Sequence, residues 1–574
     1  MKNIKYIITI ILFGSLALSC SLEEKSYTEI DMDEYIKNAA EANNVLMGIY
    51  GDLCDEGMYR YNLGMLLDIP TDLAKGEGST TNAFRIVPAN AYTSVQSDIE
   101  LTWEALYKAV YDANSFIRLL ALNVENFDDD DKALATVYMG EARALRALCY
   151  FELVRWFGNI TLTTDPMYAY KNTLSEMEQD DPVKVYEQIE KDLLYAAEVL
   201  PYATDDNLRT SNDFRFSKGA ALGLLAKVYA TWAGYPVQDE SKWEKAAETA
   251  KILIDSGKHA LLTEGVDGDS GYEQLWWNTC NGVWDPTESL IEISFYSPTS
   301  TASGARLGRI GKWNGVLASN IKGIRNIAYY RVLPSFIKKW PNLTSDLRAQ
   351  LSVANYRYLD ETRTKYDLQS SANNKIAFDP NQFATAFTEG ADSKLRDRYS
   401  KNLTPAKWDT EKYVKDANYM VDQNLSNVNW YVLRYADVLL LYAEALNEIN
   451  NGPNATAYAA INMVRRRGFG VPINVTSNTA DLASGMSYEE FRQAVRDERA
   501  YELAFEGHRR QDLIRWGIYY ETVMQTAQDM ENYLDGASAI YTAARYTQKG
   551  KHELLPIPQR EMQLMPKYKQ NPGW

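Results

Sequence analysis

Histidine is scarce in this chain of 574 residues: His259, His508 and His552 are its three examples. They are not spaced as zinc ligands are, so the sequence offers no zinc site. It also lacks the H-E-x-x-H, G-x-S-x-G, P-loop and dinucleotide-binding motifs. We therefore expect no enzyme and no cofactor. Two of the 77 acidic residues could still meet as a glycosidase pair, because sequence spacing does not constrain such pairs.

Cysteine and basic charge are also limited. The four cysteines are Cys20, Cys54, Cys149 and Cys280, and if Cys20 is an anchor, the other three are no disulfide framework. Cys149 falls in an apolar helical pattern, which predicts a buried free thiol. Sixty basic residues against 77 acidic ones give a net charge of −17, which argues against nucleic acid as a partner.

One long apolar run, Tyr6–Leu18, follows Lys2 and Lys5. It is shorter than the roughly 20 residues of a spanning helix, so it predicts a secretory signal peptide over residues 1–19. Its loss would remove two lysines and no acid, and would take the net charge from −17 to −19.

The end of this run, LALSC, resembles a bacterial lipobox. The resemblance implies cleavage before Cys20 and diacylation of its sulfur. Two or more acyl chains hold a protein on a membrane. The alternative is an ordinary secreted protein with a coincidental cysteine. Residues Ser21–Lys25 also resemble the acidic export signal of Bacteroidetes surface lipoproteins.

Amphipathic periodicity predicts long helices through much of the chain. They cover Leu101–Leu122, Lys132–Phe157, Pro182–Leu200, Lys218–Ala233, Trp243–Ser256, Tyr431–Asn450, Asn454–Arg467 and Tyr488–Trp516. Gly158, Gly257 and Gly468 follow helix ends, and Pro182 is near a start. The run Asp128–Asp131 precedes a helix, where it would cap the N-terminus; it could also hold structural Ca²⁺.

Two blocks read as loop-rich: residues 51–100, and residues 260–430 with one strand at Ser289–Phe295. The helices that flank them, mainly in 101–257 and 431–517, suggest a helical-repeat scaffold. Residues 220–236 have the small and aromatic spacing of a tetratricopeptide helix, although no regular 34-residue period is present.

Seven blocks carry a more specific signal. They are EARALRALCYFELVRWFGNI (141–160), DPVKVYEQIEKDLLYAAEVLP (181–201), FSKGAALGLLAKVYATWAGYP (216–236), YVLRYADVLLLYAEALNEIN (431–450), AINMVRRRGFG (460–470), RDERAYELAFEGHRRQDLIRWG (496–517) and LLPIPQREMQLMPKYKQNPGW (554–574). Together, and in this order, they resemble the signatures of the SusD-like (RagB/SusD) family.

The resemblance implies a mostly α fold, with a single domain over residues 20–574. Four tetratricopeptide-like helix pairs would pack against a loop-rich, ligand-facing half. It also implies a surface lipoprotein of the bacterial outer membrane that captures glycans and passes them to a SusC-like TonB-dependent transporter. Some relatives bind peptides, so a peptide ligand is the first alternative, and a surface glycoside hydrolase is the second.

Charged residues recur at helical spacing within the signatures. We interpret them as ion pairs between helices, because an unpaired buried charge is costly. They are Arg143, Arg146, Arg434, Asp437, Glu444, Glu498, Arg499, Glu502, Glu506, Arg509 and Asp512. His508 lies among them and is expected to be structural.

A glycan site needs flat rings for sugar C–H faces and polar groups for hydroxyl edges. In the family, loops between helices form the site. The candidates from the two loop-rich blocks are Asp72, Arg85, Tyr92, Trp276, Trp284, Tyr296 and Trp313. In an extended segment Trp276 and Trp277 would point in opposite directions, so one at most faces ligand. Core packing is an equally open role for each aromatic residue.

The charge changes sign locally between Glu292 and Asp346, where no acidic residue occurs. The cations there are Arg306, Arg309, Lys312, Lys322, Arg325, Arg331, Lys338 and Lys339. This basic segment could bind an anionic glycan through Arg306 and Arg309, dock on the transporter, or pair with acids of its own chain.

Overall fold

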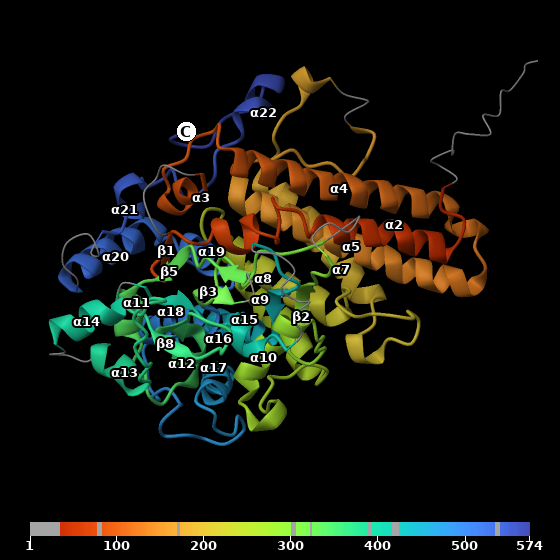
Figure 1. The fold of residues 1–574 in the computed structure, drawn as a ribbon. Coiled ribbons are helices and arrows are strands. Elements are labelled where there is room, and N and C mark those ends of the chain that lie inside the picture. Colours follow the sequence, from red (N-terminus) through yellow and green to blue (C-terminus); the bar gives the residue numbers. More distant parts are fainter. Residues whose placement is uncertain are drawn as a thin grey trace, which may run out of the picture.

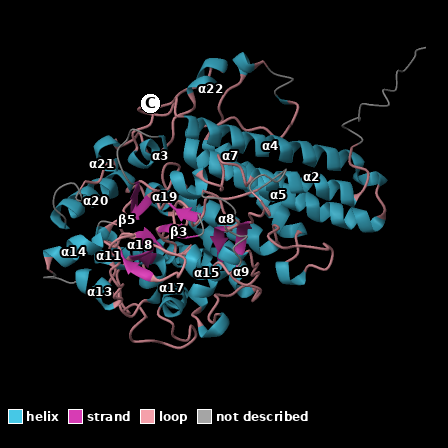
Figure 2. Ribbon diagram, viewed as in Figure 1, coloured by secondary structure: helices cyan, strands magenta, loops and turns pink. Residues whose placement is uncertain are grey.

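The structure is a computed structural model that describes residues 35–76, 83–168, 173–299, 306–321, 324–387, 392–400, 402–415, 424–533 and 540–574. The predicted signal peptide, Cys20 of the predicted lipobox and Lys322 lie outside these residues, as does the side chain of Arg325. The fold is mostly α, as expected, and its short strands gather near the middle of the molecule (Figures 1 and 2).

The scaffold consists of long helices, most of which pack against their neighbours in the chain, and the short helix α19. They are α2 (Ala39–Asp52), α4 (Ser97–Asn123), α5 (Asp129–Phe157), α7 (Pro182–Val199), α8 (Lys218–Ala233), α9 (Lys242–Asp255), α16 (Tyr435–Asn450), α17 (Ala455–Gly468), α18 (Tyr488–Glu502) and α19 (Arg509–Arg515). Contacts run from α4 to α5, then α7, α8, α9, α16 and α17. This succession confirms the helical scaffold that the periodicity predicted.

The helix ends follow their local chemistry. The Asp128 carboxylate accepts the backbone N–H of Asp131, and Asp131 in turn accepts the N–H of Ala39, so the acidic run serves as a cap. Gly158 ends α5 with a φ of +69°. Gly468 was placed wrongly after a helix end: it is the last residue of α17, and Gly470 has the positive φ.

Two predicted helices are shorter than expected. Residues 430–434 form strand β10 (Trp430–Arg434), antiparallel to β2 (Ser289–Ile293), so α16 starts only at Tyr435. The predicted helix Tyr488–Trp516 breaks after Glu502, where Phe505 and Gly507 have positive φ, and restarts as α19. The apolar periodicity continues across both breaks because strand, turn and helix all border the same core.

The loop-rich half has more regular structure than expected. Its strands, besides β2 and β10, are β1 (Ala74–Gly76), β3 (Ala318–Ile321), β4 (Ile324–Asn326), β5 (Tyr330–Val332), β6 (Val353–Ala354), β7 (Tyr356–Tyr358), β8 (Lys365–Asp367) and β9 (Thr404–Pro405). The larger sheet has the order β4-β3-β7-β8, and β1 pairs with β5.

The other helices are α3 (Ala83–Ile86), α10 (Gly271–Asn281), α11 (Pro334–Lys339), α12 (Leu347–Ser352), α13 (Asn381–Phe387), α14 (Ser393–Ser400), α15 (Thr410–Tyr413), α20 (Tyr519–Tyr533), α21 (Ala543–Tyr546) and α22 (Gln559–Leu564).

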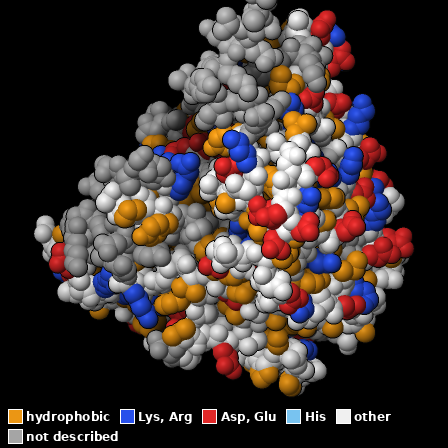
Figure 3. Space-filling model, turned by 90° about the vertical axis from the view of Figure 1, so that its right-hand side faces the viewer, with side chains coloured by type: hydrophobic (Ala, Val, Ile, Leu, Met, Phe, Trp, Pro, Cys, Tyr) orange, Lys and Arg blue, Asp and Glu red, His pale blue; other side chains and the backbone are white. Residues whose placement is uncertain are grey.

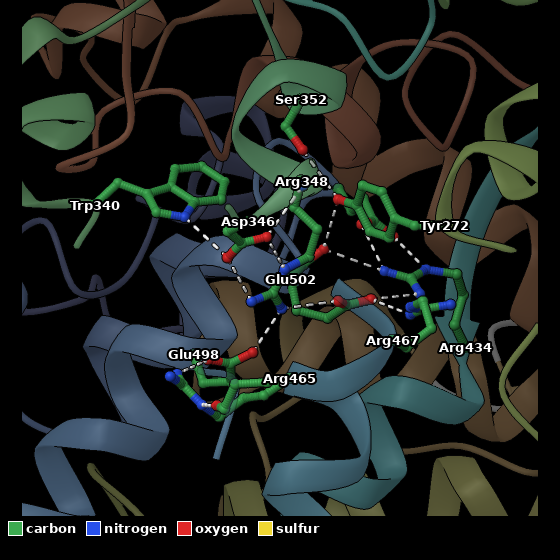
Figure 4. Close-up of polar contacts among 12 residues, drawn as sticks. Tyr272, Trp340, Asp346, Arg348, Ser352, Arg434, Arg465, Arg467, Glu498 and Glu502 are labelled. Atoms are coloured by element: carbon green, nitrogen blue, oxygen red, sulfur yellow. Dashed lines mark hydrogen bonds and ion pairs between the residues drawn. The ribbon is translucent and has the colours of Figure 1, made fainter. Parts of the chain in front are cut away.

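A buried network of charges joins the two halves (Figure 4). Glu502 of α18 accepts hydrogen bonds from Arg467 at 2.6 Å, Arg434 at 3.0 Å and Arg348 at 3.1 Å. Arg348 belongs to α12, in the loop-rich half, while Arg434 and Arg467 border or lie in scaffold helices. The network therefore fixes the position of the loop-rich half on the scaffold.

Ion pairing is confirmed for nearly all of the predicted residues, although Arg434–Glu506 and Arg509–Asp72 do not join two helices. The pairs are Arg146–Asp192, Arg434–Glu506, Asp437–Arg499, Glu444–Arg515, Glu498–Arg465, Arg499–Asp512 and Arg509–Asp72. Arg143 differs, because its guanidinium lies 4.0 Å from the Tyr195 ring centroid. His508 is buried, and its Nδ1 atom lies 2.9 Å from the Nζ atom of Lys227. It precedes α19 and does not lie inside that helix. Cys149 is a buried free thiol, as predicted.

Candidate functional site

Three distant chain segments bring aromatic rings and arginines together, in what we call the aromatic–arginine cluster: Phe84, Arg85, Arg309, Trp313 and Tyr329. The Trp313 and Tyr329 ring centroids are 4.5 Å apart, and those of Phe84 and Tyr329 are 4.4 Å apart. The Arg309 guanidinium carbon is 4.5 Å from the Trp313 centroid, and that of Arg85 is 5.0 Å from the Phe84 centroid. The cluster thus unites three predicted residues: Arg85, Arg309 and Trp313.

Local backbone geometry explains how Trp313 reaches this position. Gly311 has a φ of +76°, and its N–H donates to the Asn314 side chain at 2.8 Å. A Cβ added to Gly315 would lie 2.3 Å from the carbonyl oxygen of Gly311. Only glycine permits this tight turn, which carries Trp313 at its tip. The other partners come from α3 and from the residues just before β5, which lie near each other in Figure 1.

The cluster is partly open to solvent. Trp313 is only 8% exposed, whereas Phe84, Arg85, Arg309 and Tyr329 are half-buried. The ring planes are tilted by 57° between Trp313 and Tyr329 and by 46° between Phe84 and Tyr329, so they do not form a coplanar platform. Ligand would meet the half-buried rings and the arginines, with Trp313 behind them.

Tyr296 and Arg306 form a second, more exposed pair. They are partners in an isolated antiparallel bridge, and the Tyr296 side chain is 63% exposed. Side chains directly opposite in such a bridge lie on the same face. Arg306 is also exposed and packs beside Gly51, at the end of α2.

Other predicted residues serve the core. Trp276 is fully buried in α10, and the expected extended conformation of Trp276 and Trp277 is wrong because both are helical. Tyr92 is buried, stacks on Trp574 at 5.1 Å and accepts a hydrogen bond from Arg510. As placed here, Trp276 and Tyr92 are closed to ligand.

Asp72 and Trp284 also lie outside the cluster. Asp72 receives two hydrogen bonds of 2.8 Å from Arg509, and this guanidinium holds the pKa of the carboxyl below its usual value against the opposing effect of burial. Trp284 is half-buried beside Phe214, with 6.3 Å between ring centroids. It stays a separate candidate for ligand contact.

The cations of the basic segment differ in whether they are paired or buried within their own chain. Arg309 pairs with Glu56, and Lys339 pairs with Asp529. Lys312 and Arg331 are buried, and Arg331 donates to the carbonyl of Ala328. These residues favour the interpretation that the described part of the segment largely serves its own fold, and Arg306 differs because no described residue pairs with it.

Two cavities were not predicted from the sequence. One of about 490 Å³ lies where α2 meets α4, with Arg306 at its edge. The other, of about 430 Å³, lies between α4, residues 161–168 and 174–177, and C-terminal residues 561–568, and its lining includes four tyrosines, two methionines and Trp103. Trp103 itself is buried, as expected for a core residue. The lining residues are far apart in sequence, so no local pattern reveals either cavity.

The ionisable groups of the described residues are arranged for structure. Burial raises the pKa of Glu292 to about 8 and lowers that of His508 to about 3. Neither side chain lines either of the two cavities described above. Among the described ranges, no group of three or more His, Cys, Asp or Glu side chains is placed to hold a metal ion.

Comparison with known proteins agrees with this architecture. Residues 340–574 match the family model described as "SusD family", and residues 22–230 match one described as "Starch-binding associating with outer membrane". A SusD homolog from Bacteroides thetaiotaomicron, of known crystal structure, is 51% identical, with a TM-score of 0.88 over 96% of this chain and 100% of its own.

More distant relatives span similar lengths. A SusD-like protein from Formosa agariphila is 26% identical over 97% of this chain and 97% of its own. A structure described as a laminarin-binding SusD-like protein is 23% identical, with a TM-score of 0.65 over 94% of this chain and all of its own. The chain belongs to the SusD family. Within the part of the chain that the structure describes, no helix is both long and apolar enough to cross a membrane.

Proposed function

We propose that this protein binds glycans at the bacterial cell surface and delivers them to a SusC-like TonB-dependent transporter, without catalysing a reaction. In this proposal, acyl chains on Cys20 hold it on the outer membrane. Support comes from family membership, from the starch-binding description of the matched family model, and from the laminarin-binding relative.

The aromatic–arginine cluster is the observation that carries the proposal. Half-buried Phe84 and Tyr329 offer apolar ring faces to sugar C–H groups, and Arg85 and Arg309 offer N–H donors to hydroxyl oxygens. Trp313 packs beneath them and holds the arrangement rigid. Rings and donors at one surface are what a non-catalytic sugar site requires.

A peptide is the second candidate ligand, and one observation favours it. The cavity of about 430 Å³ beside α4 is lined mainly by apolar and aromatic groups, including Trp103, Tyr107, Met177 and Met565. Such a cavity suits an apolar side chain of a peptide better than a sugar with many hydroxyl groups.

Affinity electrophoresis separates the two proposals. The protein would migrate through gels containing a neutral glucan, an acidic polysaccharide or no additive, and a casein digest would be tested separately by calorimetry. Retardation by a polysaccharide that a Tyr329→Ala variant no longer shows supports the glycan site. Binding to peptides alone, abolished by Met177→Trp in the cavity, would replace it with the peptide function.

A further inference from the structure

The cavity between α2 and α4 has a charged lining. Its volume of about 490 Å³ lies within the range of about 300–1,000 Å³ usual for ligand pockets. The charged residues around it are Asp52, Asp55, Arg60, Glu104, Lys108 and Arg306. Three acids and three bases balance formally, so the charge available to a ligand depends on which of them are already paired.

Each acid of the cavity is already engaged. Asp52 accepts from Lys108. Asp55 accepts the backbone N–H of Gly57 at 2.9 Å, and Glu104 accepts from Arg560 at 2.6 Å. Asp52 and Glu104 are thus compensated by cations, whereas Asp55 is hydrogen-bonded to a neutral group and keeps its charge.

Two of the three bases are engaged as well. Lys108 bridges Asp52 and Asp112, and Arg60 lies 3.4 Å from Glu56. Arg306 is different: its guanidinium forms no hydrogen bond or ion pair with any residue that the structure describes. Arg306 is therefore the cation of the cavity lining that has no carboxylate partner among the described residues, and its side chain is exposed.

The position of Arg306 is set by its neighbours. Its Nε and Nη2 atoms lie 3.4 Å from where a Cβ of Gly51 would be, so the guanidinium lies beside the end of α2 at ordinary van der Waals distance. Its bridge partner Tyr296 projects on the same face and exposes 63% of its surface. An exposed ring and an unpaired planar cation thus lie on the same face of the bridge.

We propose that Tyr296 and Arg306 form a subsite for a sugar unit that carries a carboxylate or sulfate group, so that the glycan recognised is acidic. The Tyr296 ring packs against the C–H face of the sugar. The Arg306 guanidinium binds the acidic group through two parallel N–H donors, a geometry that lysine cannot reproduce. This inference rests on the glycan-binding function proposed above.

The geometry also distinguishes Arg306 from Arg309. Arg309 pairs with Glu56 and lies over Tyr61 and Trp313, so its charge is already compensated. It can donate to a hydroxyl oxygen but offers little net attraction to an anion. Recognition of the carboxylate or sulfate group is therefore assigned to Arg306 alone. The aromatic–arginine cluster binds neutral sugar units of the same glycan.

The test measures the affinity of the full-length protein in detergent for polygalacturonate, dextran sulfate and neutral laminarin, by calorimetry at low and at high salt. The variants are Arg306→Gln and Tyr296→Ala. Lys339→Gln is the matched control, since Lys339 is a cation of the same basic segment that is paired with Asp529. Thermal unfolding checks that each variant is folded, which exposed positions should permit.

We expect the wild-type protein to bind one of the two acidic polymers. Arg306→Gln should weaken this binding tenfold or more and reduce its salt dependence, Tyr296→Ala should also weaken it, and Lys339→Gln should leave it unchanged. Binding to laminarin alone, or equal losses in Arg306→Gln and Lys339→Gln, would overturn the acidic subsite and leave the glycan function standing. Absence of binding to all three polymers would count against both.

Discussion

Arg467 donates a hydrogen bond of 2.6 Å to Glu502, and both side chains are almost completely buried. Arg434 and Arg348 approach the same carboxylate from two other elements. These guanidinium groups hold the pKa of Glu502 far below its usual value, in opposition to the effect of burial. One carboxylate therefore pairs with cations that belong to both halves of the molecule.

Glu502→Gln should lower the free energy of unfolding by about 3–5 kcal/mol, because three buried arginines each lose one of their carboxylate partners. The urea midpoint, measured at pH 7, would report this loss. Glu521→Gln is the control, since Glu521 pairs with Lys549 at the surface, where a pair contributes about 0–1 kcal/mol. Equal effects of the two substitutions would contradict the role given to the network.

The surface itself mixes acidic and basic side chains, as the face in Figure 3 shows.

The buried carboxyl group of Glu292 should make the folded protein less stable as the pH rises towards 8. Its carboxyl accepts from Asn429 and Ser289, both at 2.9 Å, but burial dominates and raises the pKa to about 8. Between the ordinary carboxyl pKa and about 8, the folded state binds a proton that the unfolded state has released, so stability falls as pH rises.

Glu292→Gln keeps both polar partners and removes the titration. The variant should be more stable than the wild-type protein at pH 8, and the difference should vanish near pH 4. Urea unfolding across this pH range measures it, with the exposed Glu361→Gln as control. A variant whose stability runs parallel to that of the wild-type protein would show that Glu292 is ionised throughout.

Much of the scaffold was predictable because periodicity and capping are local. Helix α8 begins and ends at the predicted residues, and α5 begins at the acidic run that caps it. Strand β10 escaped prediction because its apolar residues continue the pattern of α16, and only pairing with the distant β2 makes them a strand. The exposed side chains of the site depend on the same kind of distant contact.

The candidate residues illustrate this limit. Trp276 and Trp313 both lie in loop-rich sequence, yet Trp276 is buried in a helix, while Trp313 borders a surface cluster. Arg306 and Arg309 are three residues apart, and only the position of Glu56 decides which one is compensated. Composition could point only to a region of the chain; which of its side chains are exposed or already paired depends on the folded contacts.

Tyr329→Ala should reduce affinity for the cognate glycan about tenfold, because it removes a half-buried ring from the aromatic–arginine cluster. Trp313→Ala should remove binding too, but at a cost of about 3–5 kcal/mol in stability, since Trp313 is buried. Calorimetric titration and thermal unfolding together separate the two effects. Full affinity in Tyr329→Ala would exclude this cluster as the binding surface.

Cys20→Ala should release the protein from the membrane. Without the thiol there is no atom to carry the diacyl group, and two acyl chains are the difference between stable anchoring and none. Fractionation of cells that express the variant should move the protein from the membrane pellet to the soluble fraction, while Cys54→Ala should leave it in the pellet. Cys54 is a matched control because its thiol is buried and burial raises its pKa to about 12, so it is not available for modification. If the Cys20→Ala protein stayed with the membrane, attachment would have to come from protein contacts, and the lipid anchor would be wrong.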